Sequence, residues 1–117
     1  MNIPSPLIDH FQITWDELGL LERVPTPPPH MKDRVISYVL LGSNPGGFLT
    51  AVLENKLYEA AGRADETNRY HLFLWAQILE ALPGGCWGNP DKVKRWQTLG
   101  GLRGLRGQAP QPEELPQ

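Results

Sequence analysis

The residues whose types and spacing could do chemistry lie where a glycine pair opens a helical segment. Pro45, Gly46 and Gly47 form a turn that runs into Phe48 and a strongly helical stretch. The first amide groups of a helix have no acceptor within it, and glycine lets a ligand approach them closely, so an anion could bind there. The sequence predicts a ligand-binding site of seven residues: Gly46, Gly47, Phe48, Arg63, Asn68, Arg69 and Trp87.

Each residue of this predicted site has a chemical role and a structural alternative. Arg63, Lys56 or Arg69 would neutralise a phosphate, Asn68 would contact a base or ribose, and Trp87 would stack on a base. The glycine pair alone is weaker evidence for phosphate binding than a full P-loop motif, which the sequence lacks. The alternative is that these glycines only form a tight turn between two helices. Arg63 could instead form a capping salt bridge with Asp65, and Trp87 could fill the core or a subunit interface.

No other pattern in the sequence indicates catalysis or metal binding. Cys86 is the only cysteine, and it cannot be paired with a base from three scattered histidines, His10, His30 and His71. The histidines have no metal-ligand spacing, and neither an H-E-x-x-H motif nor paired carboxylates occur. We therefore expect a non-enzymatic protein with no catalytic residues, no cofactor and no bound metal.

Three amphipathic segments are predicted to position the site, each bounded by Gly or Pro clusters. The first runs from His30 to Leu41 and ends at Gly42-Ser43-Asn44-Pro45. The second should run from about Gly47 to Ala61, with Gly62 closing it and an apolar stripe facing inward at Phe48, Val52, Leu53 and Leu57. Asp65 is the predicted N-cap of a third helix through Leu82, whose apolar face is Leu72, Trp75, Ile78, Leu79 and Leu82.

Two shorter helices are predicted at the ends. Thr14 and Glu17 have the spacing of a capping box for a helix through about Glu22, and Asn89-Pro90 has the N-cap and first-turn signature of a last short helix. The predicted fold is all-α, a small helical bundle of three main helices plus short N- and C-terminal helices. We divide the chain into an N-terminal arm with a Pro-rich linker (1–29), a helical domain (30–98) and a flexible tail (99–117).

Composition limits the partners that the chain should have. A length of 117 residues allows one domain, and a net charge of -2 makes nucleic acid an unexpected partner. No apolar run approaches the ~18 to 20 residues that span a bilayer, and the N-terminus lacks the features of a signal peptide, so we expect a soluble, cytoplasmic protein. A core this small, in a chain with four tryptophans, favours a homo-oligomer.

Two motifs give the chain a family resemblance. The run PGGFLTAVLENKLYEAAGRADETNR and the later CWGNPDKVKRW resemble a group of small uncharacterised bacteriophage and prophage proteins, over roughly residues 44–96. In that group a second proline precedes Pro45, an acidic residue is usual at position 56, and Ser-Pro-Glu follows the Cys-Trp-Gly loop. Here these positions hold Asn44, Lys56 and Asn89-Pro90-Asp91.

The resemblance implies a phage accessory protein that acts in the host cytoplasm. Small phage proteins often inhibit host defence, so the leading hypothesis is a counter-defence protein that binds and sequesters a nucleotide immune signal of cyclic or ADP-ribose type. The alternative is an inhibitor that binds a host protein through an apolar helical face, with Trp15, Leu18 and Leu21 on a detachable segment. Clustering of Gly46, Gly47, Arg63, Asn68 and Arg69 would favour the small anion.

Overall fold

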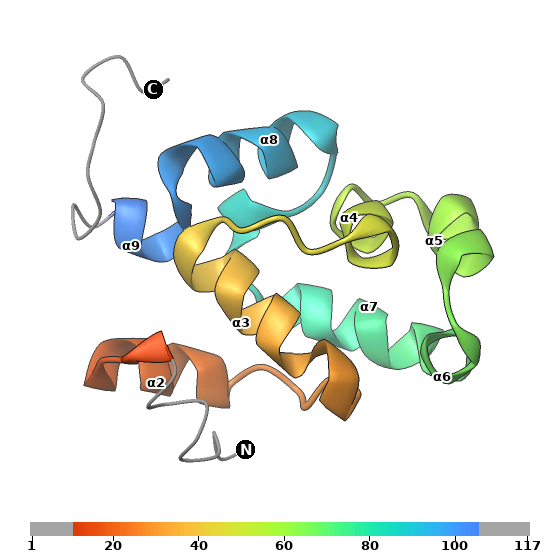
Figure 1. The fold of residues 1–117 in the computed structure, drawn as a ribbon, viewed down its shortest axis with the longest axis horizontal. Helices are drawn as coiled ribbons and strands as arrows, with labels where there is room; N and C mark the ends of the chain where they lie inside the picture. Colours follow the sequence, from red (N-terminus) through yellow and green to blue (C-terminus); the bar gives the residue numbers. More distant parts are fainter. Residues whose placement is uncertain (1–10, 106–117) are drawn as a thin grey trace.

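The computed structural model describes residues 11–105, and all their regular elements are helices (Figure 1). The all-α prediction is confirmed for this part of the chain. The division into three main helices is not, because the two longer predicted segments are each broken. The elements are α2 (Trp15–Glu22), η1 (Pro29–Met31), α3 (Lys32–Leu41), α4 (Gly47–Leu53), α5 (Leu57–Arg63), α6 (Glu66–Tyr70), α7 (Leu72–Ala81), η2 (Gly84–Cys86), α8 (Pro90–Leu99) and α9 (Gly101–Leu105).

Helix α3 crosses the middle of the molecule and is buried on two sides (Figure 1). Val35 and Val39 belong to the main core, which also takes in side chains from α4, α7 and α8. Ile36 and Leu40 form a second, smaller cluster with Leu21 of α2. The helix therefore joins the two apolar clusters, which accounts for its high share of apolar residues.

Two buried hydrogen bonds fix α3 against the C-terminal half of the core. The Tyr38 hydroxyl donates to the Cys86 carbonyl at 2.7 Å, and Trp96 Nε1 of α8 donates to the Tyr38 carbonyl at 3.0 Å. Burial raises the pKa of the Tyr38 phenol, which keeps the hydroxyl a neutral donor. Buried polar groups of this kind must be paired, so they fix the register of α3.

The second predicted helix is broken between α4 and α5. Asn55 adopts a left-handed conformation with φ 63°, which asparagine tolerates better than most residues and which a continuous helix cannot contain. The prediction of one helix over 47–61 is therefore wrong. Phe48, Val52 and Leu53 are buried as predicted, but Leu57 begins the new helix and is 71% exposed.

The third predicted helix is also divided, at His71 between α6 and α7. Asp65 is the N-cap as predicted, because its Oδ1 accepts a hydrogen bond from the Asn68 amide at 2.8 Å. The apolar face is confirmed in α7, where Trp75 and Ile78 are buried and Leu72 and Leu79 pack against the core.

The predicted capping box is confirmed at α2, and its glutamate also contacts helix α9. Thr14 and Glu17 exchange the two expected hydrogen bonds, at 3.0 and 3.3 Å. The Glu17 side chain is also fully buried and forms an ion pair with Arg103 of α9 at 2.7 Å. Arg103 donates in addition to the carbonyls of Phe11 and Gln12. The carboxylate thus ties together residues 86 positions apart.

Helix α9 corrects the predicted C-terminal boundary. Residues 101–105 were predicted to belong to a flexible tail because of their glycines, yet they form a helix that packs on α3. A β-carbon at Gly101 would lie 2.6 Å from backbone atoms of Leu40, Leu41 and Gly42, so only glycine permits this approach. The rest of the predicted tail, like the first residues of the arm, lies outside the described residues.

The Glu17–Arg103 pair should contribute measurably to stability. Arg103→Ala leaves the buried Glu17 carboxylate without its cation, and we expect the free energy of unfolding to fall by about 2 to 3 kcal/mol. This expected loss is at the low end for a buried ion pair because the Arg103 side chain is 18% exposed. Urea denaturation of this variant beside Arg95→Ala, an exposed arginine on α8, measures the difference. Equal losses in the two variants would contradict the assignment.

The same carboxylate should make stability depend on pH. Burial raises the pKa of Glu17, but hydrogen bonds from Arg103 and Thr14 outweigh it and hold the pKa below its ordinary value of 4.5. A lowered folded-state pKa gives stability that is present above the unfolded value and is lost as pH falls through the folded value. Stability should therefore fall below pH 4.5 less steeply in Glu17→Gln than in the unmodified protein. Urea denaturation at a series of pH values measures the two slopes, and equal slopes would contradict this assignment.

Candidate functional site

The predicted glycine turn opens helix α4. Gly46 has φ 90°, a conformation that other residues rarely adopt, and its amide donates to Asn44 Oδ1 at 3.0 Å. Gly47 is the first residue of α4, and no side chain caps this helix. The Gly46 amide is thus occupied by Asn44, while the amides of the first turn of α4 have no side-chain acceptor within residues 11–105.

Two arginines converge on this turn from different helices. Arg34 Nη1, from α3, lies 3.0 Å from the place of a β-carbon on Gly46, and Arg63 Nη1, from α5, lies 3.8 Å from that of Gly47. Arg63 also donates to the Gly47 carbonyl over a long 3.4 Å. Both side chains are exposed, and within residues 11–105 neither forms an ion pair with a carboxylate. The turn is therefore a small positively charged surface.

Arg34 is the site residue that sequence reasoning missed. It lies 12 positions before Gly46, in a different helix from the rest of the predicted site, and belongs to no motif. Its only sequence signal is its place on the polar side of an amphipathic helix, which any solvated arginine shares. The packing of α3 beside the turn, rather than a local pattern, makes it part of the site.

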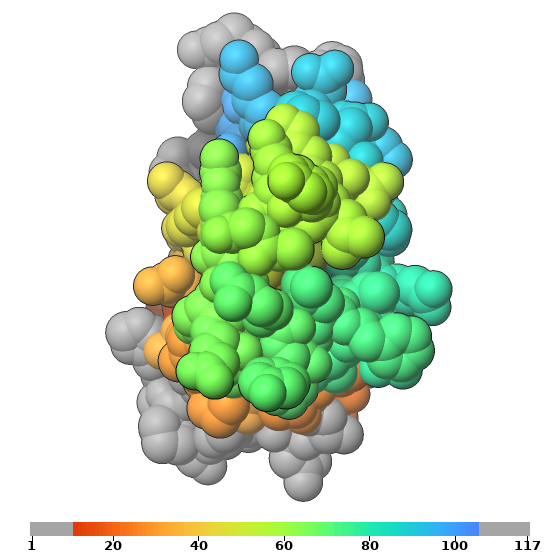
Figure 2. All heavy atoms as spheres, turned by 90° about the vertical axis from the view of Figure 1, so that its right-hand side faces the viewer, coloured from red at the N-terminus to blue at the C-terminus, as the bar shows by residue number. Residues whose placement is uncertain are grey.

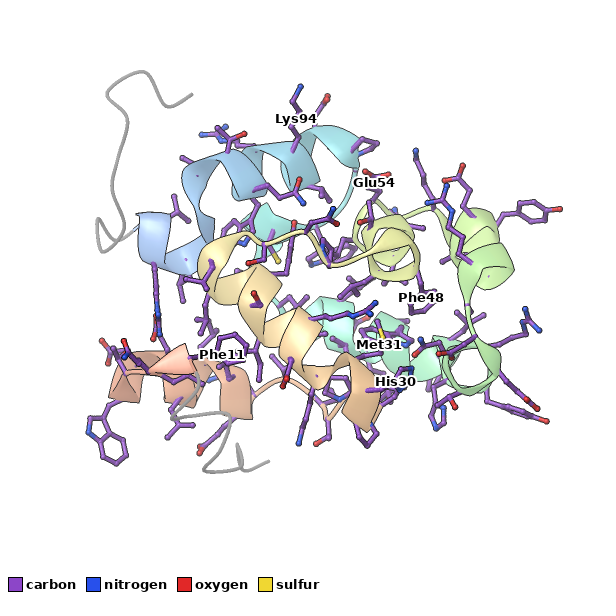
Figure 3. The ribbon with its side chains drawn as sticks, viewed as in Figure 1. Phe11, His30, Met31, Phe48, Glu54 and Lys94 are labelled. Atoms are coloured by element: carbon purple, nitrogen blue, oxygen red, sulfur yellow. The ribbon has the colours of Figure 1, made fainter. Side chains whose placement is uncertain are left out.

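The structure places Phe48 and Asn68 in the core. Phe48 lies between α4 and α7 (Figure 3), where its ring packs edge-on against Trp75 with centroids 5.6 Å apart. Asn68 is 2% exposed, and its Oδ1 accepts a hydrogen bond from Trp75 Nε1 at 3.1 Å. Both side chains are already used in packing around Trp75, so they offer a ligand no contact in this conformation.

The remaining predicted residues have other contacts. Arg69 donates to the Ala64 carbonyl at 3.3 Å and borders a separate hollow. Trp87 is half-buried against the main core, next to Gly88, whose amide donates to the carbonyl of Leu53 at the last residue of α4. Of the seven predicted residues the structure thus brings together Gly46, Gly47 and Arg63.

Asp65 does not pair with Arg63 as the alternative interpretation proposed. Its Oδ2 lies 2.8 Å from His30 Nε2, so the carboxylate links η1 to the start of α6. The Asn68 amide, followed by His30, lowers the pKa of this carboxyl below its ordinary range. Arg63 therefore does not pair with Asp65 and donates to the Gly47 carbonyl instead.

Cys86 has the surroundings of a structural thiol. It is fully buried, and burial raises its pKa to about 12, so the thiolate that a nucleophile requires does not form near neutral pH. In the described part of the chain no three His, Cys, Asp or Glu side chains gather as metal ligands would. Nor does any helix there combine the length and apolar character that a membrane span needs.

Comparisons with protein-family models, curated proteins and solved structures find no match to this chain. The resemblance to phage proteins therefore stays a prediction. Any function has to be argued from the arrangement of Arg34, Arg63 and the glycine turn, and from the surfaces that the fold exposes.

The conformation of the turn can be tested by measuring the stability of glycine variants. Gly46→Ala forces an L-residue to φ 90° and puts its methyl group 3.0 Å from Arg34 Nη1, so we expect a loss of about 1 to 2 kcal/mol. The control is Gly62→Ala in α5, where nothing lies within 4 Å and alanine should stabilise by about 0.5 to 1 kcal/mol. Thermal unfolding of both variants measures the changes; a stabilising Gly46→Ala would contradict the described turn.

Proposed function

We propose that this chain is a non-enzymatic protein that binds the phosphate group of a small molecule at Arg34, Arg63 and the Gly46–Gly47 turn. The observation that carries the proposal is the pair of guanidinium groups beside adjacent glycines, neither of them paired with a carboxylate in the described residues. A phosphate between two cations would neutralise both and accept charge-assisted hydrogen bonds from each.

The two arginines, rather than the helix, account for the expected affinity. Helix α4 has only seven residues, and the Gly46 amide already bonds to Asn44. Each guanidinium can donate two parallel hydrogen bonds to a phosphate, and the absence of side chains at the turn lets the ligand approach the backbone. Because both arginines are exposed, binding should weaken as salt screens their charge.

A nucleotide is the phosphate-bearing ligand that the family resemblance favours. In this proposal the protein is a phage-encoded counter-defence protein that sequesters a cyclic or ADP-ribose-type immune signal in the host cytoplasm, without chemical conversion. The exposed setting of both arginines supports binding of a soluble ligand from bulk solvent. Asn68 and Trp87 are not assigned to the ligand here, because Asn68 is buried and Trp87 packs against the core.

A second candidate function is binding of a host protein, and exposed apolar side chains favour it. Trp15 is 88% exposed at the start of α2, although Leu21 is buried and Glu17 ties this helix to α9, so the segment is docked. Further large apolar side chains are exposed on α5 and α7, where Tyr58 is 92% and Phe73 is 78% exposed. Exposed aromatic side chains are common anchors of protein interfaces.

Ligand-dependent melting tests the phosphate site. A nucleotide at about 100 times its Kd should stabilise the protein by roughly 2.7 kcal/mol, a shift of several degrees. Arg34→Ala and Arg63→Ala should each reduce the shift, and Gly47→Val should abolish it by covering the backbone with a side chain. Arg95→Ala, which removes an exposed arginine from α8, should leave the shift unchanged.

The panel should contain cyclic and ADP-ribose-type nucleotides together with inorganic pyrophosphate. A shift with pyrophosphate alone would support a phosphate site without nucleotide recognition. If no compound in the panel moves the melting temperature of the unmodified protein, the phosphate-binding proposal fails and protein binding becomes the leading candidate.

A further inference from the structure

A hollow of about 650 Å³ lies where α2 passes the end of α7 and the start of α9. We call it the α2 groove. Its floor is apolar, because Leu82 is buried and Leu20, Ala81 and Leu102 pack against the main core. The described residues that line it are Trp15, Asp16, Gly19, Leu20, Arg23, Ala81, Leu82, Pro83 and Leu102.

Trp15 is an uncovered wall of the α2 groove. It lines the hollow and is 88% exposed, whereas Leu21 of the same helix is buried in the smaller apolar cluster. A tryptophan side chain removes roughly 150 to 250 Å² from water when it is covered. A segment that lay in the groove would therefore gain a large apolar contact from this one residue.

Gly19 leaves the α2 wall of the groove without a side chain. It lies inside the helix, where glycine is less stable than alanine. A β-carbon at this position would meet nothing within 4 Å in the part of the chain that the structure describes. The packing of that part does not require glycine here, and the gap lets another segment approach the backbone of α2 closely.

Arg23 supplies a positive charge at one end of the groove. Its side chain is exposed, and within residues 11–105 it forms no ion pair. Asp16 is the only carboxylate among the described lining residues, and it lies seven positions earlier, roughly 10 Å away along the helix axis. A segment that fits this groove is apolar beside Trp15 and acidic at Arg23.

The sequence that follows α9 has this composition. Residues 109–117 read APQPEELPQ, with three prolines, two adjacent glutamates and no basic residue. Proline restricts the backbone to extended conformations, so a proline-rich segment loses little entropy on binding. Such segments commonly bind in grooves lined by aromatic side chains, a role that Trp15 can fill here.

This segment is attached beside the groove. Leu102 lines the groove, and α9 ends at Leu105, one helical turn further on. The seven residues 106–112 can span up to ~23 Å when extended, about twice the ~12 Å length of the eight-residue α2. Because the segment is tethered, its effective concentration at the groove is on the order of millimolar, and weak contacts are enough to hold it.

We infer that residues 110–116 dock in the α2 groove of their own chain, with prolines against Trp15 and Gly19 and the glutamates at Arg23. The tail was predicted to be flexible because it cannot form a core of its own, but a docked segment needs none, since the groove supplies the apolar surface. The inference goes beyond the proposed phosphate site and uses none of its residues. A docked tail would cover Trp15 and compete with any host protein that binds there.

A spin label on the tail of the full chain tests this inference. Gln117→Cys introduces a thiol for a nitroxide reagent, whereas Cys86 is fully buried. In nuclear magnetic resonance spectra the nitroxide should remove most of the intensity of the Gly19 amide and the Trp15 indole N–H. Adding Gly19→Met fills the groove with a side chain and should restore both signals, and Arg23→Glu should restore them in part by repelling the glutamates.

Gly62→Met is the matched control, because a β-carbon on Gly62 of α5 also meets nothing within 4 Å in the described part of the chain. Figure 1 places α2 and α5 at opposite ends of the molecule, and Figure 2 shows α5, in green, on the side that faces the viewer. This variant should therefore leave the loss of intensity at Gly19 and Trp15 unchanged.

Full intensity at Gly19 and Trp15 in the spin-labelled chain, or an equal loss over the whole surface, would overturn the inference. A loss that survives Gly19→Met, or that Gly62→Met removes, would overturn it too, because the contact would then lie elsewhere. A loss seen only when a spin-labelled chain is mixed with a separate isotope-labelled chain would assign the groove to the tail of a second copy, against the inference.

Discussion

The fold depends on the two buried hydrogen bonds that Tyr38 makes, one through its hydroxyl to Cys86 and one through its carbonyl from Trp96. The Tyr38 hydroxyl and the Trp96 indole N–H cannot be left unpaired in the core, so α3 has one permitted register against η2 and α8. With that register set, the end of α3 meets α9 backbone to backbone at Gly42 and Gly101. Helix α9 in turn places Arg103 on the buried Glu17 carboxylate and thereby docks α2.

The candidate site follows from the same register. Arg34 lies one turn before Tyr38 on α3, so the packing of the tyrosine also sets where that guanidinium stands. The break at Asn55 changes the direction of the chain between α4 and α5, and Arg63 of α5 donates to the Gly47 carbonyl of α4. The same break exposes Leu57. One local conformation thus contributes to both the positively charged turn and the exposed apolar side chains of α5.

Structural features that depend on neighbouring residues could be predicted from the sequence, and features that depend on the packing of distant helices could not. The capping residues Thr14, Asp65 and Asn89 and the apolar face of α7 depend on neighbouring residues, and the structure confirms them. The pairing of Glu17 with Arg103, the inclusion of Arg34 and the burial of Asn68 under Trp75 depend on helix packing, which periodicity does not specify. Gly101 was misassigned because glycine needed for close packing has the same sequence signature as glycine in a flexible tail.

We propose that Arg34 and Arg63 bind a phosphate at the Gly46–Gly47 turn. The most direct measurement is a nuclear magnetic resonance titration of the labelled protein with pyrophosphate and with nucleotides, following backbone amides and arginine Nε–H groups. We expect saturable shifts at the backbone amides of Gly47 and Phe48 and at the side chains of Arg34 and Arg63, with little change in α2 or α9. Unchanged signals at the turn, or shifts confined to other surfaces, would contradict it.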